Sequence, residues 1–383
     1  MTLRLPKSFI TRIACVAFFI VSFFPQANAW SEEQPVADLK IVPASGTFAD
    51  SESLNDAPLV MTTPTGIQVE DMLQEERRSS PSARRGGSPF GGARMRRPGY
   101  SATWYPSTSV DDQQTDFGLV RQLFTMGAPI WRQDGDIVIL RTTVENSLFS
   151  TDAILPDTGR AFPDELWTVN VGLNYIHQFD NGWSGGLMTT VGSASDKPFH
   201  SIDEVRASVL GFLQVPAGND RDTWQYSVMY APFSDLNFPI PGVAYGWNPS
   251  ETFQMNVGIP FSVTWKPLDA LAFNASYFPL YNVNALVTYD WTDDLQFYGG
   301  FETIRETFLL TDRASRSDQF LASEQRVIGG LRWNIWRYAA LDVNAGYAFG
   351  RYYGEGGNRR DELYDLVDIA PGPFLGSSLI VRF

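Results

Sequence analysis

F-L-G-S-S-L-I-V-R-F, residues 374–383, is the stretch that decides the fold of this chain. Counted back in twos from Phe383, the positions are mainly apolar and include Leu375, Leu379 and Val381. The positions between them include glycine, serine and arginine. Because successive side chains of a β-strand point to opposite faces, this period of two predicts a strand with one apolar face.

An amphipathic strand that ends on phenylalanine resembles the closing strand of bacterial outer-membrane β-barrels. The resemblance covers residues 100–383 and implies an all-β fold, a transmembrane antiparallel up-and-down β-barrel in a Gram-negative-type envelope. It is closest to barrel families of uncharacterised function that carry an N-terminal extension. It also implies that Leu379, Val381 and Phe383 form the signal that barrel-assembly machinery recognises, and that outer-membrane lipids surround the protein.

Residues 1–29 have the parts of an export signal. A basic start is followed by an apolar run at 13–24, which is shorter than the about 17–25 residues of a membrane-spanning helix. A-N-A at 27–29 offers a cleavage site with small residues. The only cysteine, Cys15, lies in the apolar run, so the mature protein is expected to have no disulfide.

The composition of the chain narrows the class of protein further. Of the 383 residues, 44% are hydrophobic and 14% are aromatic. No later run of about 18–20 apolar residues predicts a transmembrane helix, so a secreted β-protein and a membrane barrel both remain open. The formal net charge of −14 argues against nucleic acid as a partner.

Residues 30–99 are predicted to be a disordered periplasmic segment. They are rich in Pro, Ser, Gly and acidic residues, and seven arginines fall between positions 77 and 97. Such a composition buries too little apolar surface to offset the entropy of ordering the chain. The segment is either a solvated linker or an electrostatic tether to anionic lipid headgroups or cell-wall polymer.

From residue 100 onward, apolar and polar residues alternate in segments of strand length. The clearest segments are 167–175, 255–265, 271–277, 281–291 and 341–349. Soluble sheets alternate too, but their water-facing residues are usually Lys and Glu, whereas here they are mostly Asn, Gly, Ser and Thr. Aromatic residues recur near segment ends, as amphipathic rings do at a membrane–water interface; they are Trp167, Phe179, Trp265, Trp291, Trp333 and Trp336.

The connections alternate between short and long, as the turns and loops of a membrane barrel do. Asp180–Gly182 is a tight turn, whereas 233–254 is counted as one long connection that either contains an extra hairpin or folds into the lumen. Pro279-Leu280 is the exception, a short link where a long one is expected. The count predicts about 12–14 strands, an even-numbered barrel.

Most charged residues of the predicted strands occupy the same alternate positions as the polar residues. A charge facing lipid at mid-depth costs about 2–4 kcal/mol, so these side chains are expected to point inward. They either pair and lock a small barrel or form the selective lining of a pore. The candidate lumen residues are Arg141, Glu145, Arg206, Asp290, Glu302, Arg326, Arg332 and Asp342.

No catalytic motif is found in the sequence, and no cofactor or metal is expected. His177 has the lipid-facing parity near a short turn, and His200 lies in a long connection near Asp196 and Asp203. The leading expectation is a passive pore for small solutes. The alternatives are a closed structural barrel that anchors the envelope and an outer-membrane lipid-modifying enzyme that uses these histidines. A soluble secreted β-protein remains the alternative at the level of the fold.

Overall fold

The computed structural model describes residues 98–133, 135–219, 221–231, 238–278, 282–356 and 360–381. All of them belong to one compact unit, residues 56–383. The predicted export signal, nearly all of the predicted segment 30–99 and Phe383 lie outside the described residues.

The described residues form seventeen β-strands and two single-turn 3₁₀ helices. The helices are Ile202–Glu204 and Arg360–Glu362. The strands are β1 Gly99–Ser109, β2 Asp116–Gln133, β3 Asp136–Thr151, β4 Glu165–Gln178, β5 Ser184–Ser195, β6 Val205–Pro216, β7 Thr223–Tyr230, β8 Ile240–Ser250, β9 Phe253–Gly258, β10 Phe261–Leu268, β11 Leu271–Phe278, β12 Asn282–Asp290, β13 Leu295–Phe308, β14 Gln319–Trp336, β15 Ala339–Gly356, β16 Leu363–Ile369 and β17 Gly372–Val381.

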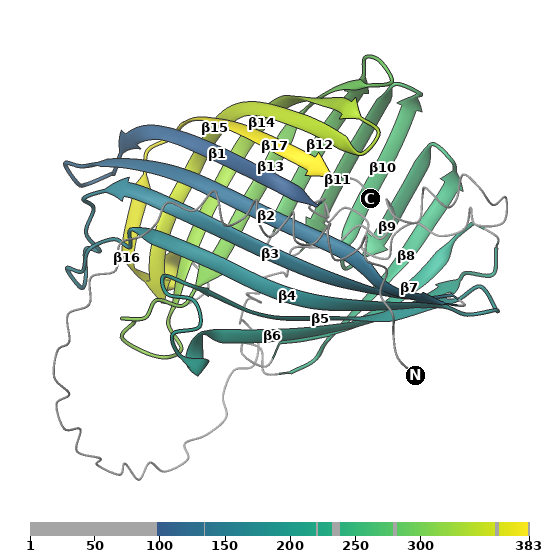
Figure 1. Ribbon diagram of the computed structural model, residues 1–383, viewed down its shortest axis with the longest axis horizontal. Coiled ribbons are helices and arrows are strands. Elements are labelled where there is room, and N and C mark those ends of the chain that lie inside the picture. The colour runs from purple at the N-terminus through teal and green to yellow at the C-terminus, as the bar shows by residue number, and fades with distance from the viewer. Residues whose placement is uncertain are drawn as a thin grey trace, which may run out of the picture. The chain divides into compact units, whose positions relative to one another are not determined.

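The strands close into an antiparallel barrel. From β1 to β15, each strand pairs with its neighbours in the chain, and β1 also pairs with β17 to complete the ring. β16 and β17 pair in succession with β15 and share one place, so the barrel has 16 positions. Figure 1 shows β1 to β6 along one side and the green strands on the other. The predicted all-β antiparallel barrel is confirmed.

The barrel has more strands than the 12–14 expected from the sequence. Residues 233–254, predicted as one connection, contain β8, whose Pro and Gly content is typical of a loop. Residues 255–265, predicted as one strand, are the two strands β9 and β10 with a turn at Ile259-Pro260. Asn256 of β9 pairs with Ser262 of β10, so residues of equal parity stay on the same face through the turn, and periodicity alone did not reveal it.

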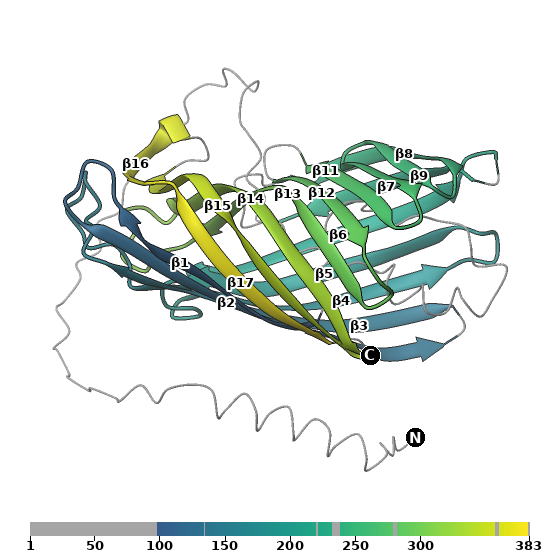
Figure 2. The ribbon, with the colours of Figure 1, turned by 90° about the horizontal axis from the view of Figure 1, so that it is seen from above.

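The two ends of the barrel differ in their connections. At the end that we call the turn end, the links are short, as at 251–252 and 337–338. At the opposite end, the loop end, lie longer connections such as 152–164 and 309–318. Figure 2 shows β16 beyond the loop end of β17. The backbone N–H of Val381 donates to the carbonyl of Pro98 at 2.8 Å, so both ends of the described chain meet at the turn end.

The outer face of the barrel is apolar, as the alternation predicts. In β17, Leu375 and Leu379 are exposed on the outer face, whereas Phe374 and Ile380 are buried on the inner one. Most tryptophans gather where strands reach the turn end, and we call this exposed set the tryptophan girdle. Its members are Trp131, Trp183, Trp224, Trp247, Trp265, Trp291, Trp333 and Trp336.

The hydrophobic core lies inside the barrel, at the loop end. It is formed by inward residues of β1, β2, β14, β15 and β17 together with residues of the connections 152–164 and 309–318. Leu155 and Phe162 of the first connection are 1% and 4% exposed, which shows that this connection turns into the barrel. Near these strands, the interior of the barrel at the loop end is therefore filled by side chains of the protein itself.

Candidate functional site in the barrel interior

Arg121 of β2 is the centre of an ionic network inside the barrel. Its Nη2 lies 3.2 Å from Oε2 of Glu306 on β13, and its Nη1 lies 3.7 Å from Oε1 of Glu324 on β14. Its Nε lies 3.7 Å from Oε1 of Glu145 on the neighbouring strand β3. Because β2 pairs with neither β13 nor β14, the first two contacts cross the interior. The network therefore joins separate parts of the wall.

Glu324 connects this centre to further arginines. It accepts a hydrogen bond from the Tyr105 hydroxyl at 2.8 Å and lies 3.7 Å from Arg326 Nη1 and 3.9 Å from Arg351 Nε. Arg326 also pairs with Glu302 across the β13–β14 ladder. The guanidinium of Arg351 lies 5.0 Å from the centre of the Tyr105 ring, a cation–π contact. One carboxylate thus serves several cations.

The members of the ionic network are largely withdrawn from water. They are Tyr105, Arg121, Glu145, Glu302, Glu306, Glu324, Arg326 and Arg351. The side chain of Arg351 is 1% exposed and that of Glu324 is 7% exposed. Removing a charge from water is costly unless it is paired, so each member depends on its partners for stability. The paired side chains of the network therefore fill this part of the barrel interior in a fixed arrangement.

An aromatic plug covers the network toward the loop end. It consists of Phe117, Phe149, Phe162, Phe320 and Tyr353, with ring centroids 5.1–6.0 Å apart in each contacting pair. Most pairs are edge-on, which aromatic quadrupoles prefer, and each is worth about 0.5–1.5 kcal/mol beyond its buried area. The plug therefore holds the connection 152–164, which carries Phe162, inside the barrel.

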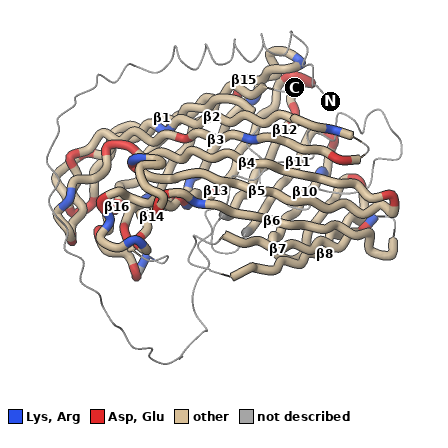
Figure 3. The backbone as a smooth tube through the Cα atoms, turned by 60° about the horizontal axis from the view of Figure 1, so that its bottom comes forward, with Lys and Arg blue, Asp and Glu red and all other residues tan. Residues whose placement is uncertain are grey.

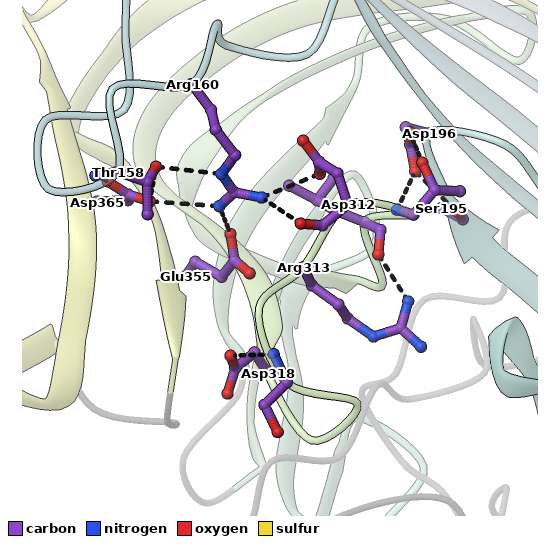
Figure 4. A network of polar contacts seen from close by, with 12 residues as sticks. Thr158, Arg160, Ser195, Asp196, Asp312, Arg313, Asp318, Glu355 and Asp365 are labelled. Atoms are coloured by element: carbon purple, nitrogen blue, oxygen red, sulfur yellow. Dashed lines mark hydrogen bonds and ion pairs between the residues drawn. The ribbon is translucent and has the colours of Figure 1, made fainter. Parts of the chain in front are cut away.

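A polar latch fixes the same connection to β15 and β16 (Figure 4). Arg160 pairs with Glu355, with Asp365 at 3.3 Å and with Asp312 at 3.0 Å. Asp365 also accepts hydrogen bonds from the backbone N–H and the hydroxyl of Thr158, at 2.8 and 2.6 Å. We call these five residues the latch. It joins the connections 152–164 and 309–318 to strands β15 and β16.

The electrostatics of the latch keep Asp365 ionised. Burial is the largest influence and on its own disfavours the charged form. Hydrogen bonds from Thr158, Arg160 and the backbone of Asp157 together outweigh it, so the pKa of Asp365 lies below its ordinary value.

A second polar contact joins the β5–β6 connection to the connection 309–318. Asp196, which is labelled in Figure 4, accepts hydrogen bonds from the backbone N–H and the hydroxyl of Thr311 at 2.8 and 2.7 Å.

The wall formed by β6 to β12 has a different chemistry. Gln225 donates to Asn256 at 3.4 Å, Asn256 donates to Ser262 at 3.0 Å, and the Thr264 hydroxyl donates to Asn274 at 3.1 Å. We call these five residues the amide belt, which runs around the wall from β7 to β11. Figure 3 shows charged residues gathered toward the two ends, with largely uncharged strands between them.

The structure brings several predicted lumen residues together. Glu145, Glu302 and Arg326 belong to the ionic network. Arg332 and Asp342 form a separate ion pair with a Nη2–Oδ2 distance of 3.1 Å, nearer the turn end.

The other predicted lumen residues, Arg141, Arg206 and Asp290, are not members of the ionic network. Asp290 is exposed at the turn end of β12 and accepts a hydrogen bond from Gln296 at 2.6 Å. Arg141 and Arg206 are half-buried on β3 and β6. Of the predicted assembly signal, Leu379 is exposed on the outer face and Val381 pairs with Ala339.

Sequence reasoning missed five members of the ionic network. They are Tyr105, Arg121, Glu306, Glu324 and Arg351. Glu306 and Glu324 have the same parity as the predicted Glu302 and Arg326, so an extension of the inward stripe would have found them. Arg351 follows a register irregularity in β15, where the parity changes, and no simple pattern identifies it.

Neither of the two histidines is a member of the ionic network. His177 Nδ1 lies 2.5 Å from Asp136 Oδ1, near the turn end, and its ring contacts Phe179 edge-on. His200 is exposed in the β5–β6 connection. Within the described residues, no group of His, Cys, Asp or Glu has the geometry of a metal site. No described helix is long and apolar enough to cross a membrane.

Comparison with known proteins finds similarity among solved structures. No family model matches this chain, and no curated protein does so. Among solved structures, the β domain of the Bordetella autotransporter BrkA is similar at 10% sequence identity and a TM-score of 0.27. The match covers 75% of this chain and 100% of that domain. The barrel fold described above rests on this chain's own strand pairing.

Proposed function

We propose that the protein is exported by residues 1–29 and spans an outer membrane as a β-barrel. A closed barrel satisfies its backbone hydrogen bonds internally, which lipid requires. The outer face exposes large apolar side chains on neighbouring strands, such as Leu173 and Leu187, a surface that is unfavourable in water. The tryptophan girdle has the character of a membrane interface.

Fractionation tests this placement. We expect the protein in the outer-membrane fraction, soluble only with detergent, and with a gel mobility that changes on heating. Recovery in the aqueous fraction without detergent would favour a secreted β-protein instead. Deleting residues 1–29 should leave the protein in the cytoplasm if they are the export signal.

Passive passage of small solutes is the function that we propose for the barrel. The observation that supports it is the division of the interior. Charges pair among themselves under the aromatic plug, whereas the inward faces of β6 to β12 carry mainly small uncharged polar groups. Small polar side chains leave space for water along that wall, as the lining of a pore requires.

Conductance in planar bilayers tests the passage. We expect steps of constant size from the purified protein. Replacing Ser276 by Phe, which adds bulk to the uncharged wall, should reduce the step size, whereas replacing the outward Val287 by Phe should leave it unchanged. Steps that neither this nor any other interior substitution alters would contradict passage through the barrel.

A closed structural barrel is the second candidate, and the plug and latch favour it. Both hold the connection 152–164 inside the loop end. In this case the wild-type protein gives no conductance steps. A variant in which a short Gly-Ser linker replaces residues 153–162 would then open the barrel and give steps. Steps from both proteins would support the pore.

A further inference from the structure

The amide belt crosses the part of the wall that has no paired charges. Its contacts run from Gln225 on β7 through Asn256 on β9 to Ser262 on β10, and from Thr264 to Asn274 on β11. Gln214 on β6 extends it, since its amide donates to the Thr223 hydroxyl at 3.2 Å. The belt therefore follows the circumference and does not run along the barrel axis.

The inward residues around the belt are uncharged along the middle of the strands. Charges on this wall occur at the ends, as Arg206 toward the loop end and Lys266 and Asp290 at the turn end. The described inward residues between those ends include Ser208, Leu210, Phe212, Gln214, Thr223, Gln225, Ser227, Met229, Ile240, Gly242, Ala244, Gly246, Asn256, Ser262, Thr264, Ala272, Asn274, Ser276, Asn284, Leu286 and Thr288.

The belt retains hydrogen-bonding capacity toward the interior. A side-chain amide offers two donors and an acceptor oxygen with two lone pairs. Among the described contacts, Asn274 uses its oxygen once, and its nitrogen is not engaged. Asn256 accepts one hydrogen bond and donates one. Both residues are half-buried, so their remaining donors and acceptors face the interior of the barrel.

This chemistry matches a neutral solute that carries many hydroxyl groups. Each hydroxyl both donates and accepts, as the amides do. An ion that leaves water at the belt meets no opposite charge, because the interior arginines and glutamates of the ionic network are paired with one another. Apolar Phe212 lies beside Gln225 and Ser227 and offers a surface for C–H groups.

The recess at this point favours passage over tight binding. Phe212, Gln225, Ser227 and Ala244 contribute to its lining, and it has room for about one water molecule. Pockets that retain a drug-sized molecule are far larger, at about 300–1,000 Å³. A small recess with exchangeable hydrogen bonds gives a weak, transient site.

We propose that the amide belt selects neutral polyhydroxylated solutes, of the sugar and polyol class, over ions of the same size. The inference rests on the proposed pore and names its solute class. Selection comes from exchanging the water molecules around the solute's hydroxyl groups for hydrogen bonds with the side-chain amides of Gln225, Asn256 and Asn274.

Proteoliposome swelling with two matched probes tests the proposal. Mannitol and sodium gluconate have the same six-carbon chain, and only gluconate is charged. We expect mannitol to enter faster. Asn256→Leu removes both belt hydrogen bonds of this residue together with the amide that it offers to the solute. It should slow mannitol by about two- to tenfold, the weight of one hydrogen bond to the solute. Asn170→Leu makes the same change on the inward face of β4, outside the belt, and should leave the rate near wild type.

A charge placed in the belt gives a second measurement. Asn274→Asp should shift the reversal potential in a salt gradient toward cation selectivity. Equal entry of mannitol and gluconate, or an equal effect of Asn256→Leu and Asn170→Leu, would overturn the proposed selection and leave the pore intact. Entry of neither probe, in a protein shown to be folded by heat-modifiable mobility, would remove the pore itself.

Discussion

Arg121 shows how strongly one side chain controls the interior. It pairs with Glu145, Glu306 and Glu324. Arg121→Met keeps much of the volume but leaves these carboxylates buried without their shared cation. Breaking a buried charge pair from one side costs about 3–5 kcal/mol, so the free energy of unfolding should fall by that amount. Urea unfolding in lipid vesicles measures it.

Arg337 provides the matched control. It is exposed in the short β14–β15 turn, with its guanidinium 4.4 Å from the centre of the Tyr338 ring. Arg337→Met should change the free energy of unfolding by no more than about 1 kcal/mol. An equal loss in both variants would show that the ionic network has no special role in stability.

Asp365 is the residue on which the latch depends. It is 0% exposed and accepts hydrogen bonds from Asp157, Thr158 and Arg160. Asp365→Asn replaces one acceptor by a donor that faces other donors, so the connection 152–164 should loosen. We expect limited proteolysis to cleave that connection faster at pH 7. Asp368→Asn, which changes a more exposed ion pair of β16 with Arg360, is the control and should resemble the wild type.

The same residue predicts a pH dependence. The folded pKa of Asp365 is lowered, so its contribution to stability is complete above the unfolded value of about 3.9 and is lost as pH falls through the folded value. Between pH 7 and about 5, protection of the connection by Asp365 should therefore stay constant. A rise in cleavage that already begins near pH 6 would point to another titrating group.

Glycine at the end of β9 shows what a single element requires. Gly258 has a φ of +149°, and a Cβ there would lie 2.3 Å from the carbonyl oxygen of Val243. Gly258→Ala must therefore displace β8 from β9, and strain of this kind costs about 1–3 kcal/mol. Thermal unfolding should show the loss. Gly211→Ala, at a position where a Cβ meets nothing within 4 Å, is the control and should be near neutral.

Strands could be predicted from the sequence where polar and apolar residues alternate without interruption. The stripes of β4, β11 and β15 and the strand at the C-terminal end were predicted, because burial on one face demands a period of two. β8 was not, since its glycine and proline content resembles a loop. The turn between β9 and β10 was missed because its only local marks are Gly258 and Pro260.

The partners of the site were less predictable than the strands. Parity predicts that Glu302 and Arg326 share a face, and the β13–β14 register makes them directly opposite. The contacts of Arg121 with Glu306 and Glu324 depend on barrel closure and curvature, which no local pattern contains. The latch also depends on the path of a loop, since Arg160 lies far from Glu355 and Asp365 in sequence.

The whole molecule depends on its last strand. The resemblance to outer-membrane barrels implies that Phe383 is part of an assembly signal, and we expect its deletion to lower the amount of protein in the outer membrane severalfold. The thermal stability of the barrels that do form should change little, because β17 keeps its ladder with β15. Immunoblots of membrane fractions and heat-modifiable mobility measure the two quantities. Normal outer-membrane levels would contradict the assembly role.

The meeting of β1 with β17 sets the order of events in folding. Gly99 pairs with Ile380 and Trp104 with Leu375, so the first and last strands of the barrel depend on each other. Contacts so distant in sequence form slowly, because a long loop must be closed first. Until β17 arrives, β1 has an open edge able to pair with another chain. The newly made chain therefore passes through an interval in which it needs protection from aggregation, and that interval ends when the ring closes.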